Sequence, residues 1–136
     1  QFERVTTTYL HLAAMADKSN ILKRILDLNV ISVNEIDSNG DTPLIYAIKK
    51  ASKENIEVLF ERDDLDFAHI NYTGEDAIDV AKKKKYSSQS NLSFNKPASK
   101  RIYLDILLSL CDSIYRWMNF LISNEINIFF IYILQN

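Results

Sequence analysis

The chain has 136 residues, of which 47% are hydrophobic and 25% charged, and a formal net charge of −2. These proportions are typical of one globular domain. The single cysteine, Cys111, excludes an intramolecular disulfide framework and favours a reducing compartment, so we expect a cytoplasmic protein. Because the first residue is Gln1 rather than methionine, we expect a fragment or processed piece of a longer chain.

Three segments of the chain resemble one another at a constant spacing. Two residues separated by this spacing are described below as one repeat apart. The matching positions are Thr8, Leu10 and Ala13, then Thr42, Leu44 and Ala47, then Asp76, Ile78 and Ala81. A constant period of this kind is typical of stacked repeats, each of which buries its apolar face against its neighbours. The sequence therefore predicts a stack of similar units rather than one mixed core.

Each copy is predicted to begin a short helix at the first of these positions. Thr8, Thr42 and Asp76 can each accept a hydrogen bond from a free amide of the first helical turn. Pro43 then occupies a helical position at which no N–H group is needed. The alanine shared by the three copies permits close approach of neighbouring helices.

A second helix is predicted in the first two copies. Its apolar side is formed by Leu22, Ile25 and Leu26 in the first copy and by Ile56, Leu59 and Phe60 in the second. Asn29 and Asp63 tolerate the left-handed conformation that commonly ends a helix. Short extended segments, residues 33–36 and 67–70, are expected to lead back to the next turn.

This order of turn, short helix, antiparallel helix and loop resembles the ankyrin repeat. Residues 40–44 (GDTPL) and 8–14 (TYLHLAA) carry nearly the whole T-P-L-H-x-A signature of that family. The resemblance covers residues 3–86 as two clear copies and one partial copy, and the extra residue per step is placed in the loop 27–31. The departures are Thr6 at the turn glycine of copy one, and Ala77 and Ile78 in copy three, which suit terminal copies.

The resemblance implies an all-α ankyrin-repeat solenoid. Its structural motif positions in this sequence are Thr8, His11, Gly40, Thr42, Pro43, Gly74 and Asp76. In the family the histidine of the signature is a structural hydrogen-bonding group between the turn and the neighbouring repeat. We expect the same role for His11.

The register of the repeat breaks after Lys85. The predicted division is a repeat stack over residues 1–86, a polar linker over 87–98, and an apolar helical tail over 99–136 that caps the stack. One face of a helix over about residues 99–122 is marked by Ile102, Ile106, Leu107, Leu110, Ile114, Trp117 and Leu121. Residues 126–134 suit either a strand or a buried helix.

A membrane span is the alternative interpretation of this tail. The stretch 117–134 is long enough to cross a bilayer. Against a span stand the polar residues near its middle, where they are most costly in hydrocarbon: Asn119, Ser123, Asn124, Glu125 and Asn127. We therefore favour the cap, and a membrane-tethered adaptor is the alternative.

The sequence carries no pattern that predicts catalysis. It has no glycine-rich phosphate loop, no Cys or His cluster with metal-ligand spacing, and no Ser, His and Asp arrangement. We expect no enzyme activity, no cofactor and no metal. Cys111 lies among leucines and is expected to be a buried small hydrophobe rather than a reactive thiol.

The resemblance implies a partner protein, bound by the turn tips and the exposed side of the first helices. The candidate contact residues are Asp37, Ser38, Asn39, Asp41, Tyr46, His69, Tyr72, Thr73 and Glu75. Core packing is the alternative for Tyr46, and simple solvation is the alternative for His69. The competing function is a regulatory segment of a larger enzyme or channel.

Charge is distributed unevenly along the chain. Acidic residues predominate between positions 54 and 79, with Arg62 the only base. This excludes a basic stripe for nucleic acid there and leaves two interpretations, a solvated face or a surface that steers a basic partner.

Residues 82–85 are four successive lysines. They complement the negative end of a helix dipole, and nuclear import or binding to an anionic surface is the alternative interpretation.

Overall fold

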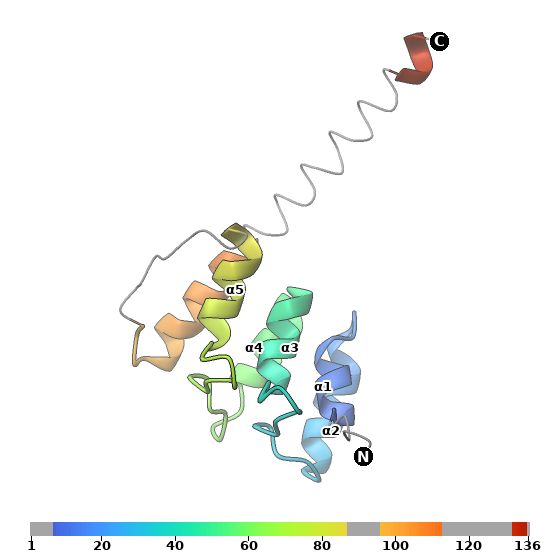
Figure 1. Ribbon diagram of the computed structural model, residues 1–136. Helices are drawn as coiled ribbons and strands as arrows, with labels where there is room; N and C mark the ends of the chain where they lie inside the picture. Colours follow the sequence, from blue (N-terminus) through green and yellow to red (C-terminus); the bar gives the residue numbers. More distant parts are fainter. Residues whose placement is uncertain (1–6, 87–95, 113–131, 136) are drawn as a thin grey trace, which may run out of the picture.

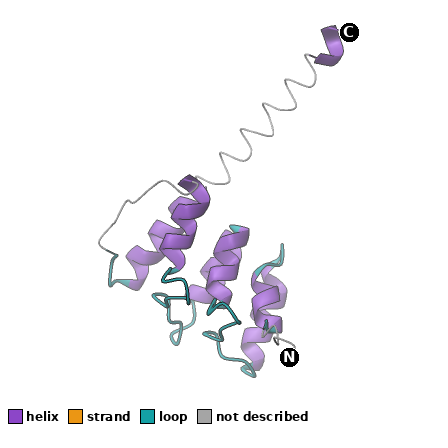
Figure 2. Cartoon of the chain, viewed as in Figure 1, coloured by secondary structure: helices purple, strands orange, loops and turns teal. Residues whose placement is uncertain are grey.

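The computed structural model describes residues 7–86, 96–112 and 132–135, and these residues are helical with no strand (Figure 2). The labelled helices are α1 (Tyr9–Ala14), α2 (Ser19–Leu28), α3 (Pro43–Lys50), α4 (Lys53–Phe60) and α5 (Ala77–Tyr86). Residues 100–112 and 132–135 are helical as well. The prediction of an all-α fold is confirmed for the described residues.

The helices form two layers (Figure 1). Helices α1, α3 and α5 lie side by side in one layer, and α2 and α4 lie behind them in the second. Contacts run between α1 and α3, between α3 and α5, and between α2 and α4, so each helix meets its counterpart in the next repeat. Residues 100–112 lie behind α5, next to α4 in the second layer.

The three predicted helix starts are confirmed by their capping hydrogen bonds. The hydroxyl groups of Thr8 and Thr42 accept from the amide three residues further on, at 3.4 and 3.5 Å. In the third copy the carboxylate of Asp76 accepts from the amide of Asp79 at 2.9 Å, and the Asp79 carboxylate accepts from the Asp76 amide at 3.2 Å. Reciprocal capping of this kind satisfies two free amides of the first turn.

The repeated apolar positions form one core. Leu10, Leu44 and Ile78 are each at most 1% exposed, in successive layers of the stack. The core continues through the alanines and the second-layer side chains Ala13, Ala47, Ala81, Leu22, Leu26, Ile56, Leu59 and Phe60. Since each unit contributes the same positions, the apolar surfaces of the units meet along the stack.

The ends of the second helices differ between copies. Asn29 ends α2 in the predicted left-handed conformation, with φ of 51°. The corresponding prediction for Asp63 is wrong, because α4 already ends at Phe60 and Glu61 caps it in a right-handed conformation. The second non-glycine residue with positive φ among the described residues is Ala51, which ends α3 where the chain reverses into α4 within two residues.

The loops that follow the second helices begin with turns. Residues 33–34 and 67–68, predicted to be extended, lie in turns instead. The backbone amide of Glu35 donates to the carbonyl of Ser32, and that of His69 to the carbonyl of Asp66, at 3.2 and 3.4 Å. These two bonds are one repeat apart, so the repeat extends to the loop conformation.

The helical residues 100–112 bury a face that agrees with the predicted one at Leu107 but not at Ile102. The buried side chains are Tyr103, Leu107 and Cys111, at a spacing of four residues, whereas Ile102 is 52% exposed. The prediction for Ile102 is therefore wrong, and Ile106 and Leu110 are half-buried beside the core. The predicted positions 114, 117 and 121 lie outside the described residues.

Tyr103 determines which face of the helical residues 100–112 packs on the core. Its ring centroid lies 6.4 Å from that of Phe60 and 5.0 Å from that of Phe67, and its hydroxyl accepts from the amide of Ile78 at 3.4 Å. A large aromatic ring buries more apolar area than an isoleucine. The helix is therefore oriented by its tyrosine.

The membrane interpretation concerns residues that lie mostly outside the described ranges. Among the residues that are described, no helix combines the length and the apolar character needed to cross a bilayer. The predicted linker also falls largely on residues 87–95, outside the description, so the division of the chain into stack, linker and tail stays a prediction.

Candidate partner-binding groove

Two tight turns, residues 37–41 and 71–75, form one edge of the candidate site and are built alike. The side-chain oxygen of Asp37 accepts from the amides two and four residues further on, at 2.9 Å each. The side-chain oxygen of Asn71 accepts from the equivalent amides at 3.1 and 2.9 Å. Such bonds replace the missing backbone partners of a turn and fix its shape.

Glycines complete the turns. Gly40 and Gly74 have φ of 76° and 82°, a left-handed conformation that other residues rarely adopt. A Cβ atom on Gly40 would also lie 2.9 Å from the backbone nitrogen of Tyr72, whose amide donates to the carbonyl of Asn39 at 3.1 Å. The two turns are therefore in direct contact, and Gly40 is needed for that contact as well as for its backbone angle.

Both histidines hold the turns in place. His11 is fully buried, and the amide of Thr8 donates to its Nδ1 at 3.2 Å, so its Nε2 carries the proton that reaches the carbonyl of Asp41 at 2.9 Å. His69 Nε2 lies 2.9 Å from the carbonyl of Gly40, and 26% of its side chain is exposed. His11 thus makes the turn-to-repeat bond that the resemblance implies, and His69 makes a similar bond from the next loop.

The two aspartates predicted as contact residues are buried. Asp37 is 4% exposed and Asp41 2% exposed. The carboxylate of Asp41 accepts from Lys49 Nζ at 2.8 Å and from the side-chain amide of Asn71 at 2.9 Å. Both carboxylates are used inside the turn region, so we leave them out of the proposed contact surface.

Asp37 is also bonded to the predicted contact residue Tyr46. The Tyr46 hydroxyl donates to the Asp37 carboxylate, and the Tyr46 ring meets His11 edge-on with ring centroids 4.8 Å apart. Burial raises the pKa of Asp37, but the hydrogen bonds from Tyr46 and from two turn amides outweigh burial and hold that pKa below its usual value. Burial and the same bond raise the pKa of Tyr46. This packing matches the core alternative for Tyr46.

The remaining predicted contact residues face solvent. Ser38, Asn39, Tyr72 and Thr73 are exposed, and Glu75 is half-buried. They line one groove of about 550 Å³ together with Asp41, Lys49, Asn71, Val80, Lys83 and Lys84. The groove therefore runs from the two turns to the helices α3 and α5.

Lysines from two helices are additional contact candidates: Lys49, Lys83 and Lys84 line the groove, and Lys50 lines a neighbouring hollow. Lys49 and Lys83 are one repeat apart, as are Lys50 and Lys84. The repeat register thus relates the lysines of the two helices, whereas residues 82–85 within their own helix predict a complement to the helix dipole, with nuclear import or an anionic surface as the alternative. The structure brings them next to those of α3.

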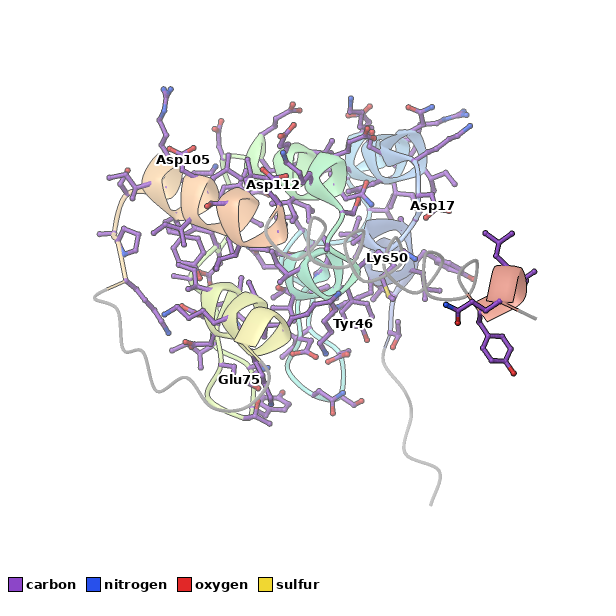
Figure 3. All side chains as sticks on the ribbon, turned by 90° about the horizontal axis from the view of Figure 1, so that it is seen from above. Asp17, Tyr46, Lys50, Glu75, Asp105 and Asp112 are labelled. Atoms are coloured by element: carbon purple, nitrogen blue, oxygen red, sulfur yellow. The ribbon has the colours of Figure 1, made fainter. Side chains whose placement is uncertain are left out.

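Most of the acidic side chains between positions 54 and 79 lie outside the groove. Glu57, Glu61, Asp63, Asp64 and Asp66 are exposed on α4 and the loop that follows it, and none of them lines the groove. Figure 3 shows the two layers from above, with Tyr46 and Glu75 on the side of α3 and α5, and Asp105 and Asp112 on the side of the second layer. These five carboxylates are therefore separate from the groove, whereas Asp41 and Glu75 line the groove and Glu54 lines a neighbouring hollow.

The described residues contain no cluster of metal-ligand side chains, and their one cysteine is buried. Within the described ranges, no three His, Cys, Asp or Glu side chains gather closely enough to hold a metal ion. Cys111 is 1% exposed, and burial raises the pKa of its thiol to about 11, which leaves it protonated at neutral pH. The prediction that Cys111 is a buried small hydrophobe is confirmed.

Comparison with known proteins agrees with this architecture. A family model described as ankyrin repeats, in three copies, matches residues 3–74, more than half of the chain. The chain belongs to the ankyrin repeat family. Comparison with curated proteins gives no match. Ankyrin repeats are generally protein–protein interaction modules and are typically non-catalytic.

Proposed function

We propose that the chain is a non-catalytic protein-binding module whose partner lies in the groove formed by the two turns and the helices α3 and α5. The observation that carries the proposal is the combination of a fixed backbone with exposed side chains. The turns are held by hydrogen bonds of Asp37 and Asn71, while Ser38, Tyr72 and Thr73 point away from the core. A fixed surface loses little entropy on binding.

Tyr72 is the proposed anchor of the interaction. It is 71% exposed at the tip of the second turn and borders the groove. Tyrosine combines a large apolar ring with a hydroxyl group and is enriched among the residues that dominate binding energy. Truncation of such an anchor typically weakens binding by about tenfold or more.

The proposal has two further parts. We place the module in the cytoplasm, on the support of its single, buried and protonated cysteine. We interpret the exposed carboxylates of α4 and its following loop as a solvated face, so a basic partner is not part of the proposal.

Selection of binding peptides tests the proposed function. A phage-displayed library of random peptides is selected on the immobilised protein, and each selected peptide is then measured against Tyr72→Ala. Tyr9→Ala is the matched control, because Tyr9 is 78% exposed but does not border the groove. Weaker binding to Tyr72→Ala with unchanged binding to Tyr9→Ala is expected. Peptides that bind both variants like the unchanged protein would contradict the groove assignment.

A further inference from the structure

We infer that the groove takes an acidic segment of a partner protein, a short stretch rich in aspartate and glutamate. The inference rests on the proposed function and names the chemistry of the partner. The residues that carry it are Lys49 and Lys50 on α3 and Lys83 and Lys84 on α5, here called the lysine ladder. The ladder is defined by the repeat, since its two lysines on α5 stand one repeat after its two lysines on α3.

The ladder lysines line two neighbouring hollows. Lys49 and Lys84 line the groove below the turns and also a neighbouring hollow of about 810 Å³, whose other lining residues include Lys50 and Lys53. The Lys84 ammonium donates to the backbone carbonyl of Lys49, which joins the two helices at this point. A segment lying along the groove would therefore pass lysines from both helices.

Two of the ladder lysines pair with carboxylate residues that are less exposed than the lysines themselves. Lys49 pairs with Asp41 at 2.8 Å, with 49% of the lysine side chain and 3% of the aspartate side chain exposed. Lys83 repeats this arrangement with Glu75 at 3.6 Å, with 67% and 24% exposed. In these two pairs an approaching ligand therefore meets the lysine before the carboxylate.

The other two ladder residues are less well neutralised. Lys50 and Asp17 lie close together in Figure 3, but the Lys50 nitrogen is 4.0 Å from the carboxylate of Asp17, which is 92% exposed. Exposed pairs of this kind are weak because water screens them. Burial lowers the pKa of Lys84, and the neighbouring charge of Lys50 lowers it further. Bound carboxylates would relieve this crowding of positive charge.

The surroundings favour a short acidic stretch over a long polyanion. Asp17, Glu54 and Asp112 line the same hollow as Lys50, and these carboxylates would repel any anion, so the hollow accepts only a ligand with few negative charges. Tyr72 borders the turn end of the same groove and offers a contact for an uncharged side chain. A peptide with a few acidic residues followed by an apolar one matches both features.

Fluorescence anisotropy with a labelled peptide tests the inference. The probe is a synthetic peptide of about ten residues with four successive glutamates followed by leucine, and the reference is the same peptide with glutamines. The ladder variant is Lys50→Gln with Lys84→Gln. The matched control is Lys23→Gln with Arg24→Gln, two exposed positions on α2 that do not line the groove or the hollow.

The glutamate peptide should bind the unchanged protein and the α2 control alike, and bind the ladder variant about tenfold more weakly. Its affinity should fall as salt rises from about 50 to about 300 mM, because screening weakens charge pairs. Circular dichroism verifies that all variants are folded. Equal binding to the ladder variant and the control, or equal binding of the glutamine peptide, would overturn the inference.

Two further outcomes distinguish an acidic-segment site from a general polyanion surface and from a groove that binds without the lysines. Tighter binding of duplex RNA, or of vesicles containing phosphatidylserine, than of the glutamate peptide would overturn the inference in favour of a general polyanion surface. Library peptides that require Tyr72 but bind the ladder variant normally would overturn it while the proposed function stands. Library peptides whose binding requires neither Tyr72 nor the ladder lysines would contradict both the inference and the proposed function.

Discussion

The imidazole of His11 donates from Nε2 to the backbone carbonyl of Asp41 across 2.9 Å, and this bond joins helix α1 to the turn of the following repeat. The other ring nitrogen accepts from the amide of Thr8, which begins α1. One side chain therefore satisfies the start of its own helix and the turn of the next unit. Since His11 is fully buried, water cannot replace either bond.

His11→Ala should therefore destabilise the protein by about 3 kcal/mol, from an unpaired buried carbonyl and a small cavity. His69→Ala is the matched comparison, because His69 also bonds a turn carbonyl at 2.9 Å but is partly exposed. His69→Ala should lower the free energy of unfolding by about 1 kcal/mol. Urea unfolding followed by circular dichroism measures both. Equal losses would show that burial of the His11 bond is not what matters.

Asn55 makes a second connection between repeats. Its side-chain amide donates to the carbonyls of Ala14 and Ala16 at 2.9 and 2.8 Å, and the residue is fully buried. These carbonyls belong to the end of α1 and have no further helical partners. Asn55→Asp would place a carboxylate against them and should destabilise by about 3 kcal/mol or more.

Ile21 provides the control, because it stands one repeat before Asn55. It is 56% exposed, and in the part of the chain that the structure describes no helix packs on that side of α2. Ile21→Asn should change stability by less than about 0.5 kcal/mol. The pair is compared by thermal unfolding. A loss for Ile21→Asn as large as that for Asn55→Asp would mean that this side of α2 is covered after all.

Ala51 is an unfavourable residue in its place. Its φ of 57° is left-handed, yet it carries a Cβ atom, and its amide bonds back to the end of α3. Ala51→Gly should stabilise the protein by about 1 kcal/mol, because glycine adopts this conformation without the steric penalty.

The opposite sign is expected for Ala47→Gly. Ala47 lies inside α3 and is fully buried, so glycine there should destabilise by about 1 kcal/mol or more. Midpoints of urea unfolding give both values. If the two glycine variants changed stability in the same direction, the left-handed conformation of Ala51 would not be what limits stability.

The repeat makes most of the fold predictable from sequence. The positions Leu10, Leu44 and Ile78 follow one register, and the same register sets the helix starts. Local signals fail where a position has several compatible conformations. Asp63 tolerates a left-handed conformation without requiring it, and Ala51 adopts one although its residue type predicts helix.

The candidate site is less predictable because burial depends on contacts between repeats. Asp37 and Asp41 follow a turn signature that suggests exposure, yet Tyr46, Lys49 and Asn71 from other segments enclose them. The lysine ladder is likewise hard to predict from one helix at a time. It becomes a surface only when α3 and α5 are placed side by side.

Tyr103 should be the residue that holds residues 100–112 in the fold, where they supply the second-layer neighbour of α5. It is 1% exposed and stacks on Phe60, whereas its neighbour Ile102 is 52% exposed. Tyr103→Ala should destabilise by about 3 to 5 kcal/mol and Ile102→Ala by less than about 0.5 kcal/mol. Thermal unfolding measures both. An unchanged midpoint for Tyr103→Ala would show that this segment does not cap the stack.

Asp37 should make stability depend on pH in the acidic range. The hydrogen bonds around its carboxylate hold its pKa in the folded protein below the ordinary value of 3.8. Because the folded-state pKa is the lower one, the carboxylate contributes stability that is fully present above the unfolded-state pKa. This contribution is lost as the pH falls through the folded-state pKa.

Asp37→Asn isolates this effect, because Asn71 makes the same turn bonds at the equivalent position. At about pH 7 the variant should be less stable by about 1 to 2 kcal/mol, since the bond from Tyr46 loses its charged acceptor. The difference should shrink as the pH falls through the folded-state pKa of Asp37, because the carboxyl group is then protonated in both the folded and unfolded states. Urea unfolding at several pH values measures the difference. A difference that stays constant from neutral to acidic pH would show that the Asp37 charge does not stabilise the turn.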